Sequence, residues 1–398
     1  MSHKNISDLA REQQDYMVAI RRDLHRNPEL SLEEAETSRK ICSELDQLGI
    51  PYEKVGDYGV IATIEGLQKN CIVALRADMD ALPIQEENDH LEFCSQKQGV
   101  SHACGHDGHV AMLLGAARIF KQVQPQLKGT VKLCFQQAEE VGKGALEILD
   151  NLKKYPVKTA FGIHLWSEIE TGRVSVEAGP RMAASDGIQI VVHGSGTHGA
   201  YPSRGVDPIL TAATIISNLA AMMAREVNPI YPSVLTFGKI EGGEIANSIP
   251  EKVILHGTLR TTNVEQREFI HSAMKRIVKG TADTFRATAE IIWLGGVPVV
   301  QNNAQCSAIA EEATAKVAGE KALIKFDTMM ASENYGEFVK TYPGVFALIG
   351  IRNENIRSTY PHHHPKFNID EAPFWIGAGL HVQYAIDFFE KNGSTQNV

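Results

Sequence analysis

The feature that most constrains the fold is an alternation of strand-like and helix-like runs over the first half of the chain. Short apolar runs typical of buried strands lie at 59–64, 71–79, 130–136 and 159–165, and helical spacing lies between them at 110–123 and 144–152. Strands that alternate with helices in this way predict a sheet covered by helices on both faces. Before them, residues 8–49 predict two helices, the second from Ser31 to Gly49.

A different order begins near residue 180. A strand at 187–194 precedes a long helix at 207–227, strands at 234–243 and 252–261, a helix at 264–285 and a strand at 288–294. This is the βαββαβ order of ferredoxin-like domains, and it has the length of a domain. From about residue 300 the chain returns to helix and strand, and it closes with a helix near 372–390. We therefore predict one discontinuous domain, 1–181 and 298–398, with 182–297 inserted as a second domain.

Charge and polarity exclude several classes of partner. The 398 residues include 39 Lys and Arg against 48 Asp and Glu, a net charge of −9. Nucleic acids and anionic membranes are bound mainly by clustered Lys and Arg, and no such cluster occurs in the sequence. The first residues mix charges every few positions, and no later run approaches the roughly 18 apolar residues of a membrane span. We expect a soluble cytoplasmic protein with no nucleic-acid and no membrane partner.

The cysteines and histidines point to different uses. The six cysteines are scattered without CxxC pairs, so most are expected to be buried free thiols. The fifteen histidines instead gather, first in the segment His102-Ala-Cys104-Gly-His106-Asp107-Gly-His109. Thiolate and imidazole are natural ligands of zinc and related divalent ions, and a turn can point Cys104 and His106 at one centre. The alternative is a His-rich loop that caps the following helix.

Two further groups are candidates for the same site. Glu139 and Glu140 follow the strand at 130–136, at the edge where α/β proteins place their sites. Two carboxylates there can act as a metal ligand and a general base, and a solvated turn is the alternative. His164 ends an apolar strand, where the alternative is a hydrogen-bonded core residue.

Prolines decide how two other segments are interpreted. His362, His363 and His364 lie between two prolines on a stiff loop, which suggests metal binding, with a chance surface run as the alternative. The segment 194–199 matches GxGxxG, but Pro202 and Pro208 interrupt the helix that should follow it. Dinucleotide binding is therefore not predicted.

In this order, the motifs resemble the metal-dependent aminoacylase and carboxypeptidase family, and specifically its amidohydrolase branch of hippurate hydrolases, auxin-conjugate hydrolases and N-acyl-amino-acid deacylases. The resemblance is carried by Leu75-Arg-Ala-Asp78-Met-Asp80-Ala-Leu-Pro83, His102-Ala-Cys104-Gly-His106-Asp107, Phe135-Gln-Gln-Ala-Glu139-Glu140, Gly162-Ile-His164, Thr197-His198-Gly199, Glu244-Ile-Ala-Asn247, Gly257-Thr258-Leu-Arg260, Ser332-Glu333 and His363-His-Pro365. It implies an α/β fold: a discontinuous, zinc-peptidase-like catalytic domain whose mixed sheet is covered by helices, and an inserted ferredoxin-like α+β lid and dimerisation domain.

The resemblance also implies two divalent metal ions per subunit, Zn, Mn, Co or Ni. Their ligands would be Cys104, His106, Glu140, His164 and His363. The histidine triplet leaves the register open, and the family's ligand position two residues before the proline selects His363. Glu139 would be the general base. Asp80 would hold metal ligands in place without binding the metal itself.

The same resemblance assigns roles to the inserted domain. His198 would stabilise the oxyanion, in its own subunit or in a partner's site, and Asn247 and Arg260 would bind the substrate carboxylate. The planar fork of arginine suits a carboxylate. A homodimer or higher homo-oligomer is implied. Gln137 stands where the family commonly has proline.

The implied function is hydrolysis of the amide bond of a small-molecule N-acyl amino acid by metal-activated water. Two other functions fit the residues themselves. In a thiol amidase, Cys104 would be the nucleophile and His106 or His164 its base. In a metal-binding protein without turnover, the ligands would be kept but no base would be needed, so Glu139 favours an enzyme.

Overall fold

The computed structural model describes residues 5–392 and divides the chain into two compact units. The first unit holds the chain up to Gly179, the segment Gln301–Asp327 and the chain from Glu337 on. The second unit holds Pro180–Val300 and Thr328–Gly336. A discontinuous α/β unit interrupted by a second unit is the predicted fold class, which is confirmed. The predicted ranges do not include the short return of the chain at Thr328–Gly336.

The first unit contains helices and strands from both ends of the chain. Its helices are α1 (Ile6–Glu12), α2 (Gln14–Arg26), α3 (Ala35–Gln47), α4 (His106–Val123), α5 (Ala145–Leu152), α8 (Ala304–Ala318), α9 (Gly336–Thr341) and α10 (Phe374–Asn392), with short 3-10 turns η1 (Gln124–Gln126), η2 (Glu139–Val141), η4 (Glu320–Ala322) and η5 (Glu354–Ile356). Its strands are β1 (Tyr52–Val55), β2 (Gly59–Ile64), β3 (Ile72–Asp78), β4 (Thr130–Gln136), β5 (Val157–Glu170), β6 (Val174–Ser175) and β15 (Gly344–Arg352). The strands β7 (Gly179–Met182) and β14 (Val300–Asn302) lie where the chain leaves and re-enters this unit.

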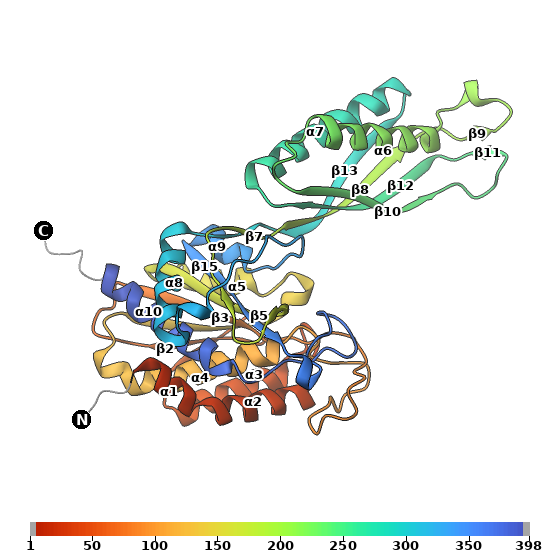
Figure 1. The fold of residues 1–398 in the computed structure, drawn as a ribbon. Helices are drawn as coiled ribbons and strands as arrows, with labels where there is room; N and C mark the ends of the chain where they lie inside the picture. Colours follow the sequence, from red (N-terminus) through yellow and green to blue (C-terminus); the bar gives the residue numbers. More distant parts are fainter. Residues whose placement is uncertain (1–4, 393–398) are drawn as a thin grey trace, which may run out of the picture. The chain divides into compact units, whose positions relative to one another are not determined.

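One mixed sheet organises the first unit. Its strand order is β1-β2-β4-β3-β5-β15-β6. The centre is parallel, because β3 pairs in parallel with β4 and β5, and β5 with β15, whereas the outer pairs are antiparallel. Alternate strand residues face opposite sides, and Leu75, Leu133 and Phe161 point into the core shared with α4 and α10. In Figure 1, α1 to α4 lie on one side of this sheet and α5 lies on the other.

The N-terminal segment differs from its prediction. It forms three helices rather than two, and α3 begins at Ala35 instead of Ser31. Ser31 fits the pattern of a helix cap, but its hydroxyl donates to Asp80 Oδ2 over 2.7 Å. A tertiary hydrogen bond therefore uses the side chain that the sequence pattern assigned to a cap.

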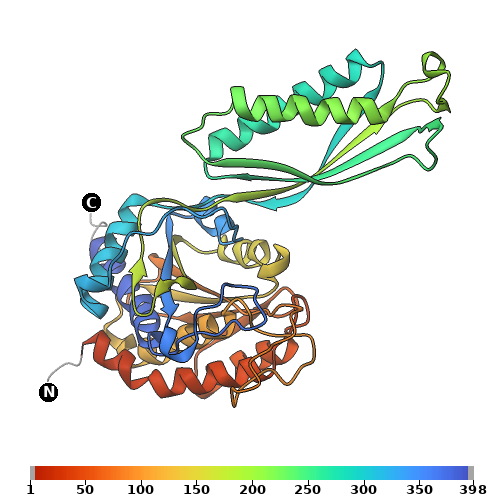
Figure 2. The ribbon, with the colours of Figure 1, turned by 45° about the vertical axis from the view of Figure 1, so that its right-hand side comes forward.

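The second unit has the predicted ferredoxin-like order. Its elements are β8 (Ala184–His193), β9 (Thr197–His198), η3 (Pro202–Arg204), α6 (Pro208–Arg225), β10 (Ser233–Gly242), β11 (Ser248–Ile249), β12 (Lys252–Thr261), α7 (Val264–Thr284) and β13 (Thr288–Val297). The main sheet runs β10-β12-β8-β13 with every pair antiparallel, and β9 pairs with β11. Figure 2 shows α6 and α7 together on one face of the main sheet. The unit has its own apolar core, which includes Ile190, Ile215 and Ile270.

Helix α6 is long and apolar enough to cross a membrane by length and composition alone. The sequence interpretation did not single it out. Its Ala212, Ile215 and Leu219 side chains are fully buried in the core of the second unit. The core helix of a protein can pass the same test of length and composition, and 33% of this helix is buried.

Candidate metal centre

The candidate residues of the first unit gather where the parallel strands β3 and β4 end, beside His164 of β5. β3 ends at Asp78 and β4 at Gln136, and the register pairs these two residues. In β5, Gly162 pairs with Arg76, so His164 lies level with the end of β3. In open α/β sheets, ligands bind outside the carboxyl ends of the strands. The loops after β3 and β4 and the start of α4 carry the other candidates to this edge.

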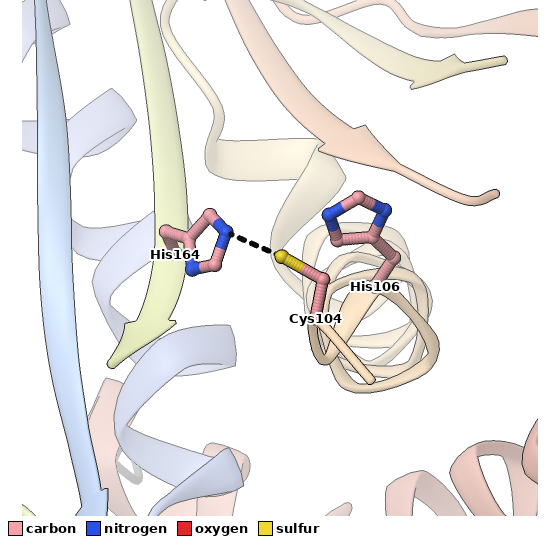
Figure 3. Close-up of side chains that lie close together, drawn as sticks. All are labelled: Cys104, His106 and His164. Atoms are coloured by element: carbon pink, nitrogen blue, oxygen red, sulfur yellow. Dashed lines mark hydrogen bonds between the residues drawn. The ribbon is translucent and has the colours of Figure 1, made fainter. Parts of the chain in front are cut away.

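Cys104 and His106 are presented by the turn into α4. Gly105 between them has a φ of 91°, in the left-handed region that favours glycine. Figure 3 shows the Cys104 sulfur between the rings of His106 and His164. Cys104 Sγ lies 3.6 Å from His164 Nε2. The glycine thus allows the two residues on either side of it to face the same strand residue.

Asp80 orients the ring of His106. The ring Nδ1 lies 3.0 Å from the Asp80 carbonyl oxygen and 3.2 Å from Asp80 Oδ1, and both are acceptors, so Nδ1 carries the proton. Nε2 is buried without a hydrogen bond and lies 3.9 Å from Glu140 Oε1. Asp80 Oδ2 also accepts the backbone N–H of Glu140 over 2.9 Å. One carboxylate therefore holds two of the predicted ligands.

Glu139 and Glu140 lie in the turn η2, directly after β4. Ala138 before them has a φ of 57°, a left-handed conformation that is uncommon for a residue with a side chain. Its backbone N–H donates to Glu34 Oε1 over 2.7 Å. Strained backbone of this kind is frequent at functional sites, where the surrounding contacts maintain it.

Of the three consecutive histidines, His363 is the one that faces a carboxylate of the cluster. Its Nε2 lies 3.5 Å from Glu140 Oε2, and its backbone N–H donates to the Ala103 carbonyl over 2.8 Å. Its φ of 63° is again left-handed. His362 instead hydrogen-bonds a carbonyl of β5, and His364 stacks on a tyrosine ring.

These side chains fit a pair of divalent ions. Three overlapping groups have potential ligand atoms within 4.8 Å of one another: Cys104, His106 and His164; Cys104, Glu140 and His363; and His106, Glu139 and Glu140. The Nε2 of His106 and the Oε1 of Glu140 are buried polar atoms without a hydrogen bond, which is costly unless another group binds them. Thiolate, imidazole and carboxylate together suit zinc and neighbouring divalent ions.

The electrostatics around His106 and Cys104 favour positive charge. Burial alone would lower the pKa of His106, but Asp78, the Cys104 sulfur and the hydrogen bond to Asp80 raise it well above its usual value. Burial, followed by the nearby Glu140, raises the pKa of the Cys104 thiol well above its ordinary range. Ligation by a cation requires loss of these protons and supplies the positive charge that the surrounding carboxylates favour.

A fourth group, Asp78 with His106 and His109, also lies close together. Two of its members are already engaged by protein groups. Asp78 forms an ion pair with the buried Arg76 over 2.5 Å and a hydrogen bond with His109 Nδ1 over 2.5 Å. His109 Nε2 accepts the Leu165 backbone N–H over 2.9 Å. Asp78 and His109 therefore belong to the support of the cluster, and sequence reasoning did not find this use of His109.

The other predicted residues lie in the second unit. His198, on β9, accepts the Ala200 N–H at Nδ1 over 3.1 Å, so its proton is on Nε2. Asn247 is exposed and directly precedes β11, the strand paired with β9. Arg260, on β12, donates from Nη1 to Ser332 Oγ over 2.6 Å. In the second unit, the His198 ring therefore has its Nε2 proton available for donation. Arg260 lies beside the Ser332-Glu333 motif.

Comparison with known proteins adds a family and several relatives. The model of Peptidase family M20/M25/M40 matches residues 74–386. Thermostable carboxypeptidase 2 of Saccharolobus solfataricus is 36% identical over 98% of this chain and 99% of its own length. N-acetylcysteine deacetylase of Bacillus subtilis is 34% identical over 94% and 97%. IAA-amino acid hydrolase ILR1-like 2 of Arabidopsis thaliana is 37% identical over 96% and 88%.

A solved structure shows the same architecture. It is the Bacillus subtilis YXEP protein, described as a dinuclear metal binding peptidase from the M20 family. The two chains superpose with a TM-score of 0.84 at 33% sequence identity, covering 96% of this chain and 99% of the other. The dinuclear metal site is a property of that relative, and the clustered donors of this chain are of a kind that suits such a site.

Proposed function

This chain belongs to peptidase family M20/M25/M40 and is a metal-dependent hydrolase of its amidohydrolase branch, and on that premise we propose that it hydrolyses the amide bond of N-acyl amino acids. The observation that carries the proposal is the position of Glu139. Its carboxylate lies within 4.8 Å of the potential ligand atoms of His106 and Glu140. A storage site for metal needs ligands but no second carboxylate at this distance.

We propose that Cys104, His106, Glu140, His164 and His363 hold two divalent ions. When bound, such ions act as Lewis acids that make water acidic and polarise a carbonyl group. Glu139 is the general base: its carboxylate takes a proton from the attacking water and returns it to the leaving amine. Asp80 keeps the proton of His106 on Nδ1, so Nε2 stays available for ligation.

The second unit supplies substrate-binding groups in this proposal. His198 carries its proton on Nε2, as a donor to a developing oxyanion requires. Arg260 and Asn247 bind the free carboxylate of the substrate, and the Arg260 guanidinium presents the planar fork that suits this group. A homo-oligomeric assembly and a cytoplasmic location stay predictions.

The relatives support a substrate with a free carboxylate. Their names combine a carboxypeptidase, a deacetylase of an N-acetylated amino acid and a hydrolase of an auxin–amino acid conjugate. Each of these substrates has an amide bond to an amino acid whose own carboxylate is free. A hydrolysis panel of N-acetyl, N-benzoyl and indole-acetyl amino acids, with dipeptides as a further arm, therefore tests the substrate class. Cleavage of carboxylate-blocked amides at the same rate would contradict it.

The Glu139→Gln variant tests the proposed base. Gln keeps the size of the side chain but cannot accept a proton, so kcat should fall by about 100- to 10,000-fold. Co²⁺ binding, followed by visible absorption, should remain because the proposed ligands are unchanged. Hydrolysis at the wild-type rate would exclude Glu139 as the base.

Chelation separates this proposal from a thiol amidase. Activity should be lost on dialysis against a chelator and return with Zn²⁺, Mn²⁺ or Co²⁺. Because burial and Glu140 keep the pKa of Cys104 well above its ordinary range, the sulfur is a poor nucleophile unless a cation removes its proton. Full activity after complete removal of metal would favour the thiol mechanism.

A further inference from the structure

We propose that His109 and His362 are positioning residues that hold the peptide groups of Leu165 from two sides and thereby fix His164 in the tautomer that offers Nε2 to the ligand cluster. The inference deepens the proposed metal site and rests on it. Neither residue belongs to the proposed ligand set. His109 is buried and His362 is half-buried, and both lie within hydrogen-bond distance of Leu165 in β5.

The amide side of Leu165 determines the protonation of His109. A backbone N–H can only donate, and the Leu165 N–H lies 2.9 Å from His109 Nε2, so Nε2 carries no proton. The proton is therefore on Nδ1, which donates to Asp78 Oδ1 over 2.5 Å. Asp78 is in turn paired with Arg76, and all three side chains are buried. This chain of contacts anchors His109 to β3 on one side and to β5 on the other.

The carbonyl side of Leu165 determines the protonation of His164. A carbonyl oxygen can only accept, and it lies 2.8 Å from His164 Nδ1 and 3.0 Å from His362 Nε2, so both nitrogens carry protons. His164 then has its lone pair on Nε2, the atom that faces Cys104 Sγ. His362 Nδ1 lies 3.1 Å from the Ser167 hydroxyl, which donates to it. The His362 ring also stacks on Trp166 with centroids 4.4 Å apart.

The two positioning histidines come from the segments that carry two other ligands. His109 follows His106 by three residues on α4, so both lie on one side of the first helical turn. His362 directly precedes His363. Displacement of the Leu165 peptide would therefore disturb His164 directly and loosen the contacts of the segments that hold His106 and His363. Such outer contacts commonly affect metal affinity by about 10- to 100-fold.

The test compares isosteric and rescuing variants. His362→Phe keeps the stacked ring but removes the donor to Leu165, and His109→Leu removes both hydrogen bonds of that ring. His109→Gln retains an acceptor for the Leu165 N–H and a donor for Asp78, so it should restore what His109→Leu loses. His364→Phe is the matched control, because this neighbour stacks on Tyr360 with centroids 4.6 Å apart and takes no part in the contacts of Leu165.

Two readouts are used, and the first does not depend on metal. Nitrogen-15 NMR of the metal-free protein should show His164 in one tautomer, protonated on Nδ1, in the wild type, His364→Phe and His109→Gln. His362→Phe and His109→Leu should show a mixture of tautomers. In Co²⁺ titrations followed by visible absorption, these two variants should lose about 10- to 100-fold in affinity for at least one ion.

The outcomes separate this inference from the proposed function. A single Nδ1-protonated tautomer of His164 in folded His362→Phe and His109→Leu, together with wild-type Co²⁺ affinity, would overturn the inference and leave the metal site intact. If the wild type binds no Co²⁺, the proposed metal site fails, and the tautomer measurement still decides the role of His109 and His362. If His109→Leu does not fold, the comparison of His362→Phe with His364→Phe still tests the inference.

Discussion

His362, His363 and His364 are adjacent in the chain, and their side chains have three different surroundings. His363 faces Glu140, His362 donates to a carbonyl 197 residues away, and His364 stacks on Tyr360. The composition of the triplet predicts metal binding but does not distinguish its members. The left-handed φ of His363 distinguishes it from its two neighbours, and no local sequence pattern predicts this backbone conformation. Spacing from the following proline selected His363 only through resemblance to a family.

Gln137 shows what a departure from the family pattern does. Its Oε1 accepts the Gly59 backbone N–H over 2.9 Å and that of Tyr58 over 2.5 Å, which ties the start of β2 to the loop before Glu139. A proline at this position has no side-chain acceptor for these amides. Gln137 therefore forms hydrogen bonds at the edge of the site that a proline side chain could not form.

Glu34 makes a pH-dependent contribution to stability. Burial raises its pKa to about 7 from the usual 4.5, with the charge of Asp80 as a smaller cause in the same direction. The native state then holds this proton more tightly than the unfolded chain does, so the stabilisation is full below about pH 4.5 and is lost as pH rises to about 7. Glu34→Gln should remove this loss and raise the free energy of unfolding at pH 8 by about 1 to 3 kcal/mol.

Urea unfolding of the metal-free protein at pH 5 and pH 8 measures the effect of Glu34. Glu33→Gln is the matched control, because Glu33 is exposed beside the buried Glu34. The control should leave the difference in stability between the two pH values unchanged. Equal effects of the two substitutions would show that general surface charge, not burial of Glu34, causes the pH dependence.

At the scale of elements, the local sequence pattern predicted where the strands of the sheet lie. It predicted less well where individual strands and helices begin and end. Strand β4 spans Thr130–Gln136, as its apolar run indicates, whereas β5 continues to Glu170, beyond the predicted end at 165. The extension pairs with β15, which lies far along the chain, so the local sequence pattern cannot predict this pairing. The start of α3 differs for the same reason, because the partner of Ser31 is 49 residues away.

The turn into α4 depends on a conformation that favours glycine. An added Cβ at Gly105 would have its nearest contacts at 3.8 Å, so a methyl group fits and backbone strain is the main cost of Gly105→Ala. A left-handed conformation costs an L-residue about 1 to 2 kcal/mol. We expect this loss in the free energy of unfolding and a weaker affinity for Co²⁺, because relaxation of the turn moves Cys104 and His106 relative to each other.

Gly49→Ala is the control for the turn. Gly49 also has a positive φ, 60°, and open space around its Cβ position, but it lies just after α3 and presents no candidate ligand. It should show a similar loss of stability with wild-type Co²⁺ affinity. Unchanged Co²⁺ affinity in Gly105→Ala would mean that the geometry of the turn does not set the ligand positions.

At the scale of the whole molecule, the predicted site residues are divided between the two units. The predicted ligands Cys104, His106, Glu140, His164 and His363 all lie in the first unit, while His198, Asn247 and Arg260 lie in the second. Each unit has a separate apolar core. The change in element order near residue 180 indicates a second sheet, because a βαββαβ run closes its own sheet. The return at Thr328–Gly336 was not predicted, since this segment contains no helix or strand of its own apart from the start of α9 at Gly336.

This division predicts where metal stabilises the protein. A ligand that binds the native state at 100 times its Kd adds about 2.7 kcal/mol to the free energy of unfolding. If the ions bind as proposed, Co²⁺ should slow amide hydrogen exchange in α4 and β5, which carry His106 and His164. Exchange in α6 and α7 should stay unchanged, because their buried residues Ile215 and Ile270 belong to the other core.

In a Cys104→Ser and His363→Ala double variant, Co²⁺ should have little effect on either unit. Equal slowing of amide hydrogen exchange in both units of the wild type would contradict the prediction. It would show that the two units unfold together, in spite of their separate cores.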